Sequence, residues 1–330
     1  MKQELIPLNA PHKWKQALED IPIAFGHTWE SCYAMFLSTG NNTFLYQFTC
    51  DNVKIICPLV ERAYKEHIDI QTPYGFSGFV GNRDFPEFRT HWDRFVQEQG
   101  YLAGYIGLNP MLSNQTCYVA GEIFQHNTLY VLNLEKPTDE LFRNFHLNRR
   151  RQLKNYEYDK AKLTSNKTIL KSFFIQNFHS FFSDKNVTSV YNFSLYSLSF
   201  LLDLDNVITV GIYEEGEVKA VSVFGYTPYG AEYLFNISLP EGQRHTVALL
   251  WYGINLLKTL NIPYLNLGGG VNQGDSLSLF KQRFGAQELP LKSLKQVYNL
   301  KLYSSLCEDA GVSSKDFTGY FPAYRQNTLQ

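Results

Sequence analysis

The order of predicted elements in the second half of the chain most constrains the fold. Three strand-like segments separated by short, turn-rich sequences are followed by a loop, an amphipathic helix and a fourth strand. In chain order these are residues 207–213, 218–226, 231–238, 239–245, 246–260 and 264–267. Short turns between strands are typical of antiparallel neighbours, and the insertion of a helix between strands is typical of mixed α/β domains. We therefore expect a mixed α/β sheet here.

The first half of the chain also alternates strands and helices. Two strand-like runs, 43–49 and 53–60, flank Asp51–Asn52, a reasonable hairpin turn. A predicted helix over 85–98 is followed by strands at 101–108 and 129–134 and by a helix that starts at Thr138 and continues to Lys154. This half therefore also favours a mixed α/β domain.

A length of 330 residues exceeds what one hydrophobic core usually organises, so we expect two domains. The polar stretch 160–167 is the predicted linker, which gives domains over 1–160 and 161–330. In an alternative division, the C-terminal tail packs back on the first domain. The tetrapeptide Thr-Pro-Tyr-Gly occurs at both Thr72 and Thr227, but four turn-forming residues recur easily by chance.

Composition excludes several classes of protein. The formal net charge of −1 gives no overall electrostatic footprint for DNA. Five scattered cysteines without C-x-x-C spacing predict reduced thiols and neither a disulfide framework nor a metal site. The N-terminus lacks a signal-peptide core, and no run reaches the 18 apolar residues that a membrane span needs. We therefore expect a soluble cytoplasmic protein.

Two motifs near the C-terminus carry a resemblance. A strand that ends in three glycines, Tyr264–Gly270, is followed by Leu279–Ala286, which contains F-K-x-x-F-G. These motifs resemble the C-terminal signature of the Fem-like (peptidoglycan bridge-forming) branch of the GNAT acyltransferase superfamily. Companion features in the expected order are Pro58–Arg62, Thr72–Gly78, Arg149–Lys154 and Tyr320–Arg325.

The resemblance covers most of the chain and implies two tandem GNAT-like domains packed together. Two features depart from the family pattern. Residues 241–246, E-G-Q-R-H-T, do not keep the Q/R-x-x-G-x-G/A loop that binds pyrophosphate in GNAT proteins, and no segment has the length of the coiled-coil arm of some Fem proteins.

The activity implied is N-acyl transfer from acyl-CoA, a co-substrate and not a bound cofactor, to an amine. The acceptor would be an amino sugar, a sugar nucleotide or a peptide, nucleotide-linked or lipid-linked, in cell-envelope or polysaccharide biosynthesis. A second interpretation is aminoacyl-tRNA-dependent transfer to a peptidoglycan precursor, which the near-neutral charge disfavours. A third is a non-catalytic GNAT-like binding module, which the altered 241–246 loop favours.

Catalytic candidates follow from what acyl transfer requires: a neutral amine, donors for the oxyanion and a proton acceptor. The resemblance places Lys281 at the reaction centre, where a cation stabilises an oxyanion or holds a phosphate; the alternative is a solvated helix lysine. Glu232, within a strand, is a candidate proton acceptor, and His245 is a second one.

Donor-binding candidates lie at the predicted phosphate position and beside the glycines. They are Arg244, Gly268, Gly269, Gly270 and Phe280. Acceptor-binding candidates lie in the Pro-Tyr-Gly loop, the basic helix and a later segment. They are Tyr74, Gly75, Arg150, Lys154 and Tyr191. Arg150 and Lys154 are expected on one helical face at i, i+4, Arg283 on the surface, and Asp275 as the N-cap of the next helix.

Overall fold

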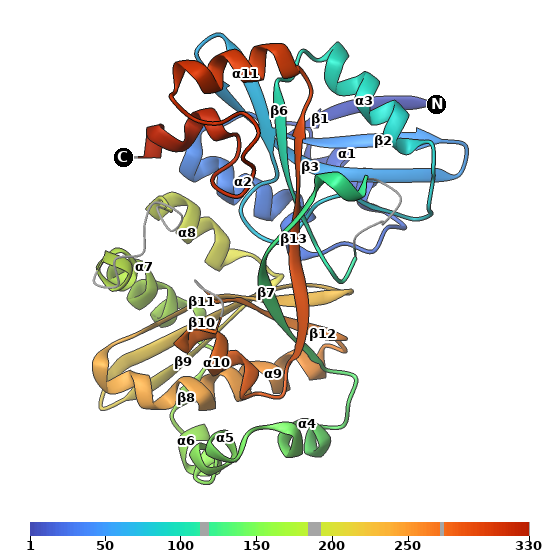
Figure 1. Cartoon of the computed structure of the whole chain (residues 1–330). Coiled ribbons are helices and arrows are strands. Elements are labelled where there is room, and N and C mark those ends of the chain that lie inside the picture. The colour runs from blue at the N-terminus through green and yellow to red at the C-terminus, as the bar shows by residue number, and fades with distance from the viewer. Residues whose placement is uncertain (113–118, 184–192, 271–273, 330) are drawn as a thin grey trace. The chain divides into compact units, whose positions relative to one another are not determined.

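The first of two structural units is built from two separate stretches of the chain. The computed structural model describes residues 1–112, 119–183, 193–270 and 274–329 (Figure 1). Residues 1–126 and 291–330 cluster into the first unit, and residues 127–290 form the second. The predicted boundary at 160/161 differs from this division, whereas the alternative that grouped the C-terminal tail with the first domain agrees with it.

The sheet of the first unit has the strand order β1-β2-β3-β4-β6-β13, with the short β5 beside β3. Its pairs are antiparallel except for β4 and β6, which run parallel. The strands are β1 (Lys2–Pro7), β2 (Thr43–Cys50), β3 (Val53–Tyr64), β4 (His67–Gln71), β5 (Val80–Gly81), β6 (Ala103–Leu108) and β13 (Gln287–Val297). The helices are α1 (Pro11–Leu18), η1 (Phe25–His27), α2 (Trp29–Thr39), α3 (Phe88–Glu98), η3 (Ala120–Glu122), α11 (Leu300–Asp309) and η6 (Ala323–Leu329).

The sheet of the second unit has the order β7-β12-β11-β10-β9-β8. Here β11 and β12 are the parallel pair, and α9 connects them. The strands are β7 (Ile123–Asn133), β8 (Leu163–Thr164), β9 (Val207–Glu214), β10 (Glu217–Thr227), β11 (Gly230–Ser238) and β12 (Tyr264–Gly269). The helices are α4 (Thr138–Asn144), α5 (Leu147–Gln152), α6 (Tyr156–Lys160), α7 (Lys167–Ser183), α8 (Leu195–Asp203), η5 (Pro240–His245), α9 (Thr246–Thr259) and α10 (Ser276–Gln282).

In the chain, the strand that completes each sheet comes directly after a strand of the other sheet. β7 comes after β6, yet it pairs antiparallel with β12. β13 comes after β12, yet it pairs antiparallel with β6. The two units therefore share one plan: an antiparallel meander, a helix that crosses to a parallel strand, and a final antiparallel neighbour.

The connecting helices carry apolar faces that build the two main cores. In α3, Phe88, Trp92, Phe95 and Val96 are buried at i, i+4, i+7 and i+8, the spacing of one helical face. They pack against aromatic and aliphatic side chains of β2, β3 and β6. The helix α9 is apolar over most of its surface, because it packs on its sheet and under α4–α6.

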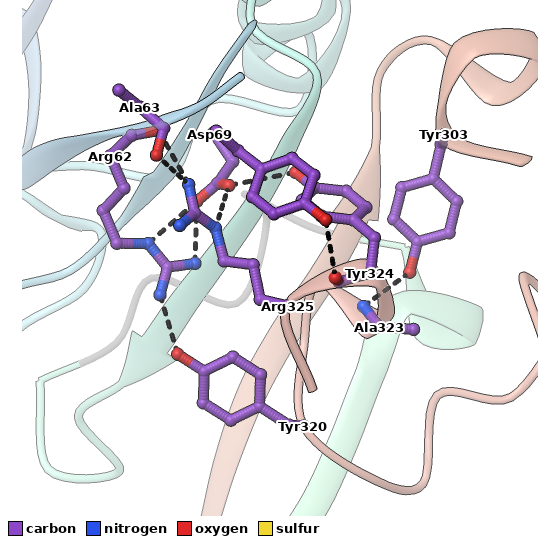
Figure 2. Close-up of polar contacts among 9 residues, drawn as sticks. Arg62, Ala63, Asp69, Tyr303, Tyr320, Ala323, Tyr324 and Arg325 are labelled. Atoms are coloured by element: carbon purple, nitrogen blue, oxygen red, sulfur yellow. Dashed lines mark hydrogen bonds and ion pairs between the residues drawn. The ribbon is translucent and has the colours of Figure 1, made fainter. Parts of the chain in front are cut away.

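A buried ionic cluster ties the C-terminal segment to β3 and β4 (Figure 2). Asp69, fully buried, accepts hydrogen bonds from Arg62 Nε (2.8 Å), Arg325 Nε (2.6 Å) and the Tyr324 hydroxyl (2.9 Å). Arg62 Nη1 also donates to the Tyr320 hydroxyl at 2.9 Å. This cluster explains why residues 320–325, part of the predicted family pattern, belong with the first unit.

Most predicted elements are confirmed to within a few residues. The predicted hairpin at Asp51–Asn52 joins β2 and β3, and the meander over 207–238 is present. The helix predicted from Thr138 to Lys154 is wrong as one element, because the chain breaks between α4 and α5 and α5 ends at Gln152. No described helix combines the length and the apolar character needed to cross a bilayer.

Candidate functional site

The C-terminal end of β12 is the candidate site. Parallel pairing of β11 with β12 extends over only two residue pairs, Ala231 with Leu265 and Glu232 with Asn266. Beyond them β12 enters Gly268–Gly270. Gly268 has a φ of +76°, which favours glycine, and a Cβ there would lie 3.1 Å from Lys281 Nζ. The lack of side chains at this turn thus admits a lysine to the backbone.

Lys281 enters the site from α10. Asp275 caps this helix as predicted, its Oδ1 accepting from the Ser278 N–H at 2.7 Å. Lys281 is only 6% exposed, and its Nζ donates to the Gly269 carbonyl at 2.6 Å. Burial lowers the pKa of Lys281 to about 8, although Asp275 acts in the opposite direction. The alternative of a solvated helix lysine is therefore wrong.

Two asparagines hold the glycine turn in place, and sequence reasoning missed both. Asn266 Oδ1 accepts from the Gly268 N–H at 2.8 Å, and Asn127 Nδ2 donates to the Gly270 carbonyl at 2.8 Å. Asn127 lies on β7, far from the motif in sequence, so no local signal indicated it. Asn266 lies inside the motif, two residues before the first glycine, and this spacing was a usable signal for an Asx-type contact.

Glu232 lies next to Asn266 across the parallel pair, and such neighbours point to the same face of a sheet. Both side chains are buried, Glu232 at 5% and Asn266 at 8% exposure. The structure thus makes Glu232 an inward carboxylate, one of the two orientations open from the sequence. Its catalytic role stays a prediction.

Arg244 and His245 lie in η5, where the sequence predicts a donor phosphate. Instead, a carboxylate occupies their neighbourhood: Glu214 Oε2 lies 3.0 Å from Arg244 Nη2 and 3.6 Å from His245 Nε2. Arg244 Nε also donates to His245 Nε2 at 2.9 Å, which engages the lone pair that a base would use. Lys162 and Arg244 lower the pKa of Glu214 to about 2, so the carboxylate is ionised at neutral pH.

The segment 240–245 is also closed against its sheet. A Cβ at Gly242 would lie 2.1 Å from the Lys219 carbonyl, so this glycine permits close packing on β10. The single glycine of the altered loop therefore serves packing in this structure. The roles of Arg244 and His245 stay predictions.

The basic segment is arranged differently from the prediction. Arg150 and Lys154 do not share a helical face, because α5 ends at Gln152. The neighbouring Arg149 is the buried residue: its guanidinium lies 4.4 Å from the centre of the Phe280 ring and 5.3 Å from that of Phe284. Phe280, a predicted donor contact, therefore packs against an arginine.

The remaining acceptor candidates lie elsewhere. Tyr74 is 41% exposed and Gly75 has a φ of +116°; both belong to the first unit, in a loop between β4 and β5. Tyr191 lies outside the residues that the structure describes. Within the second unit, the structure brings together Lys281 and Gly268–Gly270, and places Glu232 one strand away.

The chemistry available at this site follows from the donors. A buried ammonium has three N–H donors, and among the described residues Gly269 takes one of them. In surroundings of low dielectric, such a cation strongly stabilises negative charge on a nearby oxygen. The arrangement suits a reaction in which a carbonyl oxygen becomes an oxyanion, and it suits an anion such as phosphate.

Comparisons with solved structures identify the fold. FemX aligns with a TM-score of 0.66 at 10% identity, over 92% of this chain and 99% of its own. The C-terminal domain of a putative lysylphosphatidylglycerol synthetase from Agrobacterium fabrum aligns with a TM-score of 0.56 at 13% identity, over 90% and 97%. L-PGS from Bacillus licheniformis aligns with 0.57 at 13% identity, over 88% and 92%.

Neither a family model nor a curated protein sequence matches this chain. The likeness is therefore one of structure, and it extends over both units. It confirms the fold expected from Tyr264–Gly270 and Leu279–Ala286: the protein has a Fem-like fold, made of two units of mixed α/β architecture.

Proposed function

We propose that this protein is a GNAT-like transferase of cell-envelope biosynthesis that moves an acyl or aminoacyl group onto an amine. The observation that carries the proposal is Lys281, a lysine 6% exposed at the glycine-rich end of β12. The fold shared with FemX, L-PGS and the putative lysylphosphatidylglycerol synthetase supports the class of protein. A small amine acceptor and a cytoplasmic location are parts of the same proposal.

The proposed reaction needs no covalent intermediate. The neutral amine attacks the carbonyl carbon of the thioester or ester, forming the C–N bond while the carbonyl electron pair moves to oxygen. Lys281 donates a hydrogen bond to that oxyanion. On collapse, the C–S or C–O bond breaks, the amine proton passes to Glu232 or to water, and the leaving group takes up a proton.

The donor defines two versions of this function. Acyl-CoA is the first candidate, as the sequence motifs predict. Aminoacyl-tRNA is the second, and one observation argues against CoA bound in the usual GNAT place: Glu214 occupies the neighbourhood of Arg244 and His245, where a CoA pyrophosphate would be expected. A carboxylate at that place repels phosphate. A binding module without chemistry is the third candidate, and a buried lysine of lowered pKa argues against it.

Thermal shifts with acetyl-CoA, CoA, UDP-amino sugars, dTDP-amino sugars and charged tRNA would first identify the donor class. Transfer is then measured as thiol release or as loss of the aminoacyl group from tRNA. We expect Lys281→Ala to lower kcat/KM by about 100-fold or more, the usual loss for one oxyanion donor. In the wild type, kcat should fall as the pH rises through about 8, because the ammonium is lost there.

Lys258→Ala is the matched control, because Lys258 is another lysine of the second unit that donates to backbone carbonyls, including that of Lys136 at 2.6 Å. Its turnover per folded molecule should stay within about twofold of wild type. Equal activity of Lys281→Ala and wild type with a working substrate pair would sink the proposed role of Lys281.

A further inference from the structure

Three arginines of the second unit have no carboxylate partner among the described side chains and, unlike the exposed Arg151 and Lys154 beside them, include buried donor atoms. Most other basic residues of this unit lie within 4.0 Å of a carboxylate. The pairs are Arg143–Asp139, Lys136–Glu140, Lys160–Glu157, Lys162–Glu214, Lys171–Asp203, Lys219–Glu217 and Arg244–Glu214. Among the described side chains, no carboxylate pairs with Arg149, Arg150 or Arg283. We call these three residues the arginine patch.

The patch is held in a fixed position. The His146 N–H donates to the Arg283 carbonyl at 2.9 Å, which joins the start of α5 to the end of α10. The Arg149 guanidinium packs on Phe280 and Phe284, and its Nη1 donates to Gln152 Oε1 at 2.7 Å. Arg283 is exposed, Arg150 is half-buried and Arg149 is 7% exposed, so the patch runs from the surface inward.

The patch carries donors that the described protein groups leave unused. The Nε atoms of Arg149 and Arg150 are both buried, and neither has a hydrogen-bond partner among the described residues. Burial, together with the nearby charge of Arg283, lowers the pKa of Arg149. Buried donors without partners and like charges without a counter-charge both cost free energy, and an anion would relieve both.

We propose that the arginine patch binds phosphate groups of the nucleotide that carries the transferred group. Guanidinium groups match phosphate oxygens in a two-pronged geometry, and arginine is the usual residue where that geometry is required. Arg283 lies two residues after Lys281, so one short helix, α10, links the patch to the candidate reaction centre. The proposal rests on the proposed function only in taking the ligand to be the donor.

The altered loop over 241–246 leaves open which surface binds the donor phosphates, and the arginine patch is such a surface. The position expected for donor phosphates, beside Arg244 and His245, faces the ionised Glu214. A donor that carries phosphates needs a different cationic surface in this unit, and no described carboxylate forms an ion pair with the patch. Its phosphates come from one of two sources, CoA or the 3′ end of an RNA, which share the same chemistry.

The test is binding, measured without turnover. CoA is titrated by calorimetry, and a fluorescein-labelled single-stranded RNA of about 12 nucleotides ending in CCA is titrated by fluorescence anisotropy, a length within the usual site sizes. The test variant carries Arg150→Gln and Arg283→Gln and leaves the packed Arg149 in place. The control variant carries Arg143→Gln and Lys160→Gln, which removes the same charge from residues that have carboxylate partners.

We expect wild-type protein to bind one of the two probes and the test variant to bind it at least about 10-fold more weakly, with a reduced dependence on salt concentration. The control variant should bind within about twofold of wild type. CoA binding alone would name CoA as the source of the phosphates, and RNA binding alone would name RNA.

Two results overturn the proposal: wild-type protein that binds neither probe, and equal losses in the test and control variants. Failure of the proposed function looks different. In that case the patch would bind its probe with the expected variant pattern, but the bound acyl-CoA or aminoacyl-RNA would not be discharged by any amine acceptor.

Discussion

The two units share one topology but differ at the end of the parallel strand. In the first unit, the end of β6 is closed by the loop that follows β4. Thr72 Oγ1 accepts from the Gly107 N–H at 3.0 Å, and Asn109 Nδ2 donates to the Phe76 carbonyl at 3.1 Å. A Cβ at Gly78 would lie 2.4 Å from the Gly107 carbonyl. The C-terminal end of β6 is therefore covered by uncharged groups of the same unit.

In the second unit, the equivalent end of β12 receives a buried cation. Among the residues that the structure describes, Lys281 has one carbonyl partner there, and its pKa is lowered to about 8. The cations of the first unit have more partners: the half-buried Arg62 and Arg325 share the carboxylate of Asp69, and Lys295 donates to the carbonyls of Phe317 and Gly319. The comparison indicates that a cation beside a carboxylate or several carbonyls stabilises a fold, whereas a cation with a single described partner is available to a ligand.

The largest effect is expected for a substitution in the first unit that removes a buried charge. Asp69→Asn removes the buried counter-charge of Arg62 and Arg325, and breaking a buried ion pair costs about 3–5 kcal/mol. Urea denaturation would measure the loss of unfolding free energy. Asp309→Asn, which breaks the exposed pair with Lys65, should cost less than about 1 kcal/mol. Equal losses of unfolding free energy in the two variants would show that the buried ionic cluster around Asp69 contributes little to stability.

A smaller effect is expected from the charge of Lys281 and should depend on pH. The pKa of this lysine is about 8 in the folded protein, against an ordinary value of 10.5, so the unfolded chain binds more protons between these two values. Stability due to this group therefore rises with pH from about 8 to 10.5 and is lowest below 8. The difference between the two pKa values corresponds to at most about 3 kcal/mol.

Denaturation of wild type and Lys281→Met across this pH range would measure that contribution, because the two proteins share every other titrating group. The unfolding free energy of wild type should rise relative to the variant as the pH increases. Parallel curves would mean that Lys281 is more solvated than its burial indicates, and the contrast with the first unit would disappear.

The smallest effect is expected at Asn127, which acts through the glycine turn. Asn127→Ala should cost about 1 kcal/mol in stability, the usual value for one hydrogen bond. Turnover should fall by more than that loss explains, because the Gly270 carbonyl is released beside Lys281. Asn133→Ala on the same strand, which loses a contact with the Glu135 N–H at 2.9 Å, is the control. Equal losses of kcat/KM in both variants would show that Asn127 contributes to stability alone.

Local sequence patterns predicted the antiparallel meander, the hairpin and the helix cap of this fold. The meander over 207–238 and the hairpin at Asp51–Asn52 follow from turn chemistry and alternation, and the cap at Asp275 follows from capping preferences. The candidate lysine was found through a motif. The repeated Thr-Pro-Tyr-Gly was no guide to the shared plan, because Thr72 follows β4 whereas Thr227 ends β10, the strand before β11.

Long-range arrangement was not predictable in this way. The predicted boundary at 160/161 rests on a polar stretch that lies inside the second unit, whereas the division at 126/127 follows from the exchange of β7 and β13, which departs from the usual pairing of successive strands. The helix over 138–154 was predicted too long because its polar sequence contains no Pro or Gly to mark the break before Leu147. Asn127 reaches the glycine turn across a strand pair that only the folded chain brings together.

The division of the first unit into two stretches has a consequence for synthesis on the ribosome. Residues 127–290 form a continuous segment that can fold as soon as it emerges, whereas the first unit must wait for residues 291–330. Until then Asp69 lacks Tyr324 and Arg325, two of the three hydrogen-bond partners that it has among the described residues, and β6 lacks β13. The nascent chain therefore passes through a stage in which the unit made second is complete and the unit begun first is still open along one strand edge.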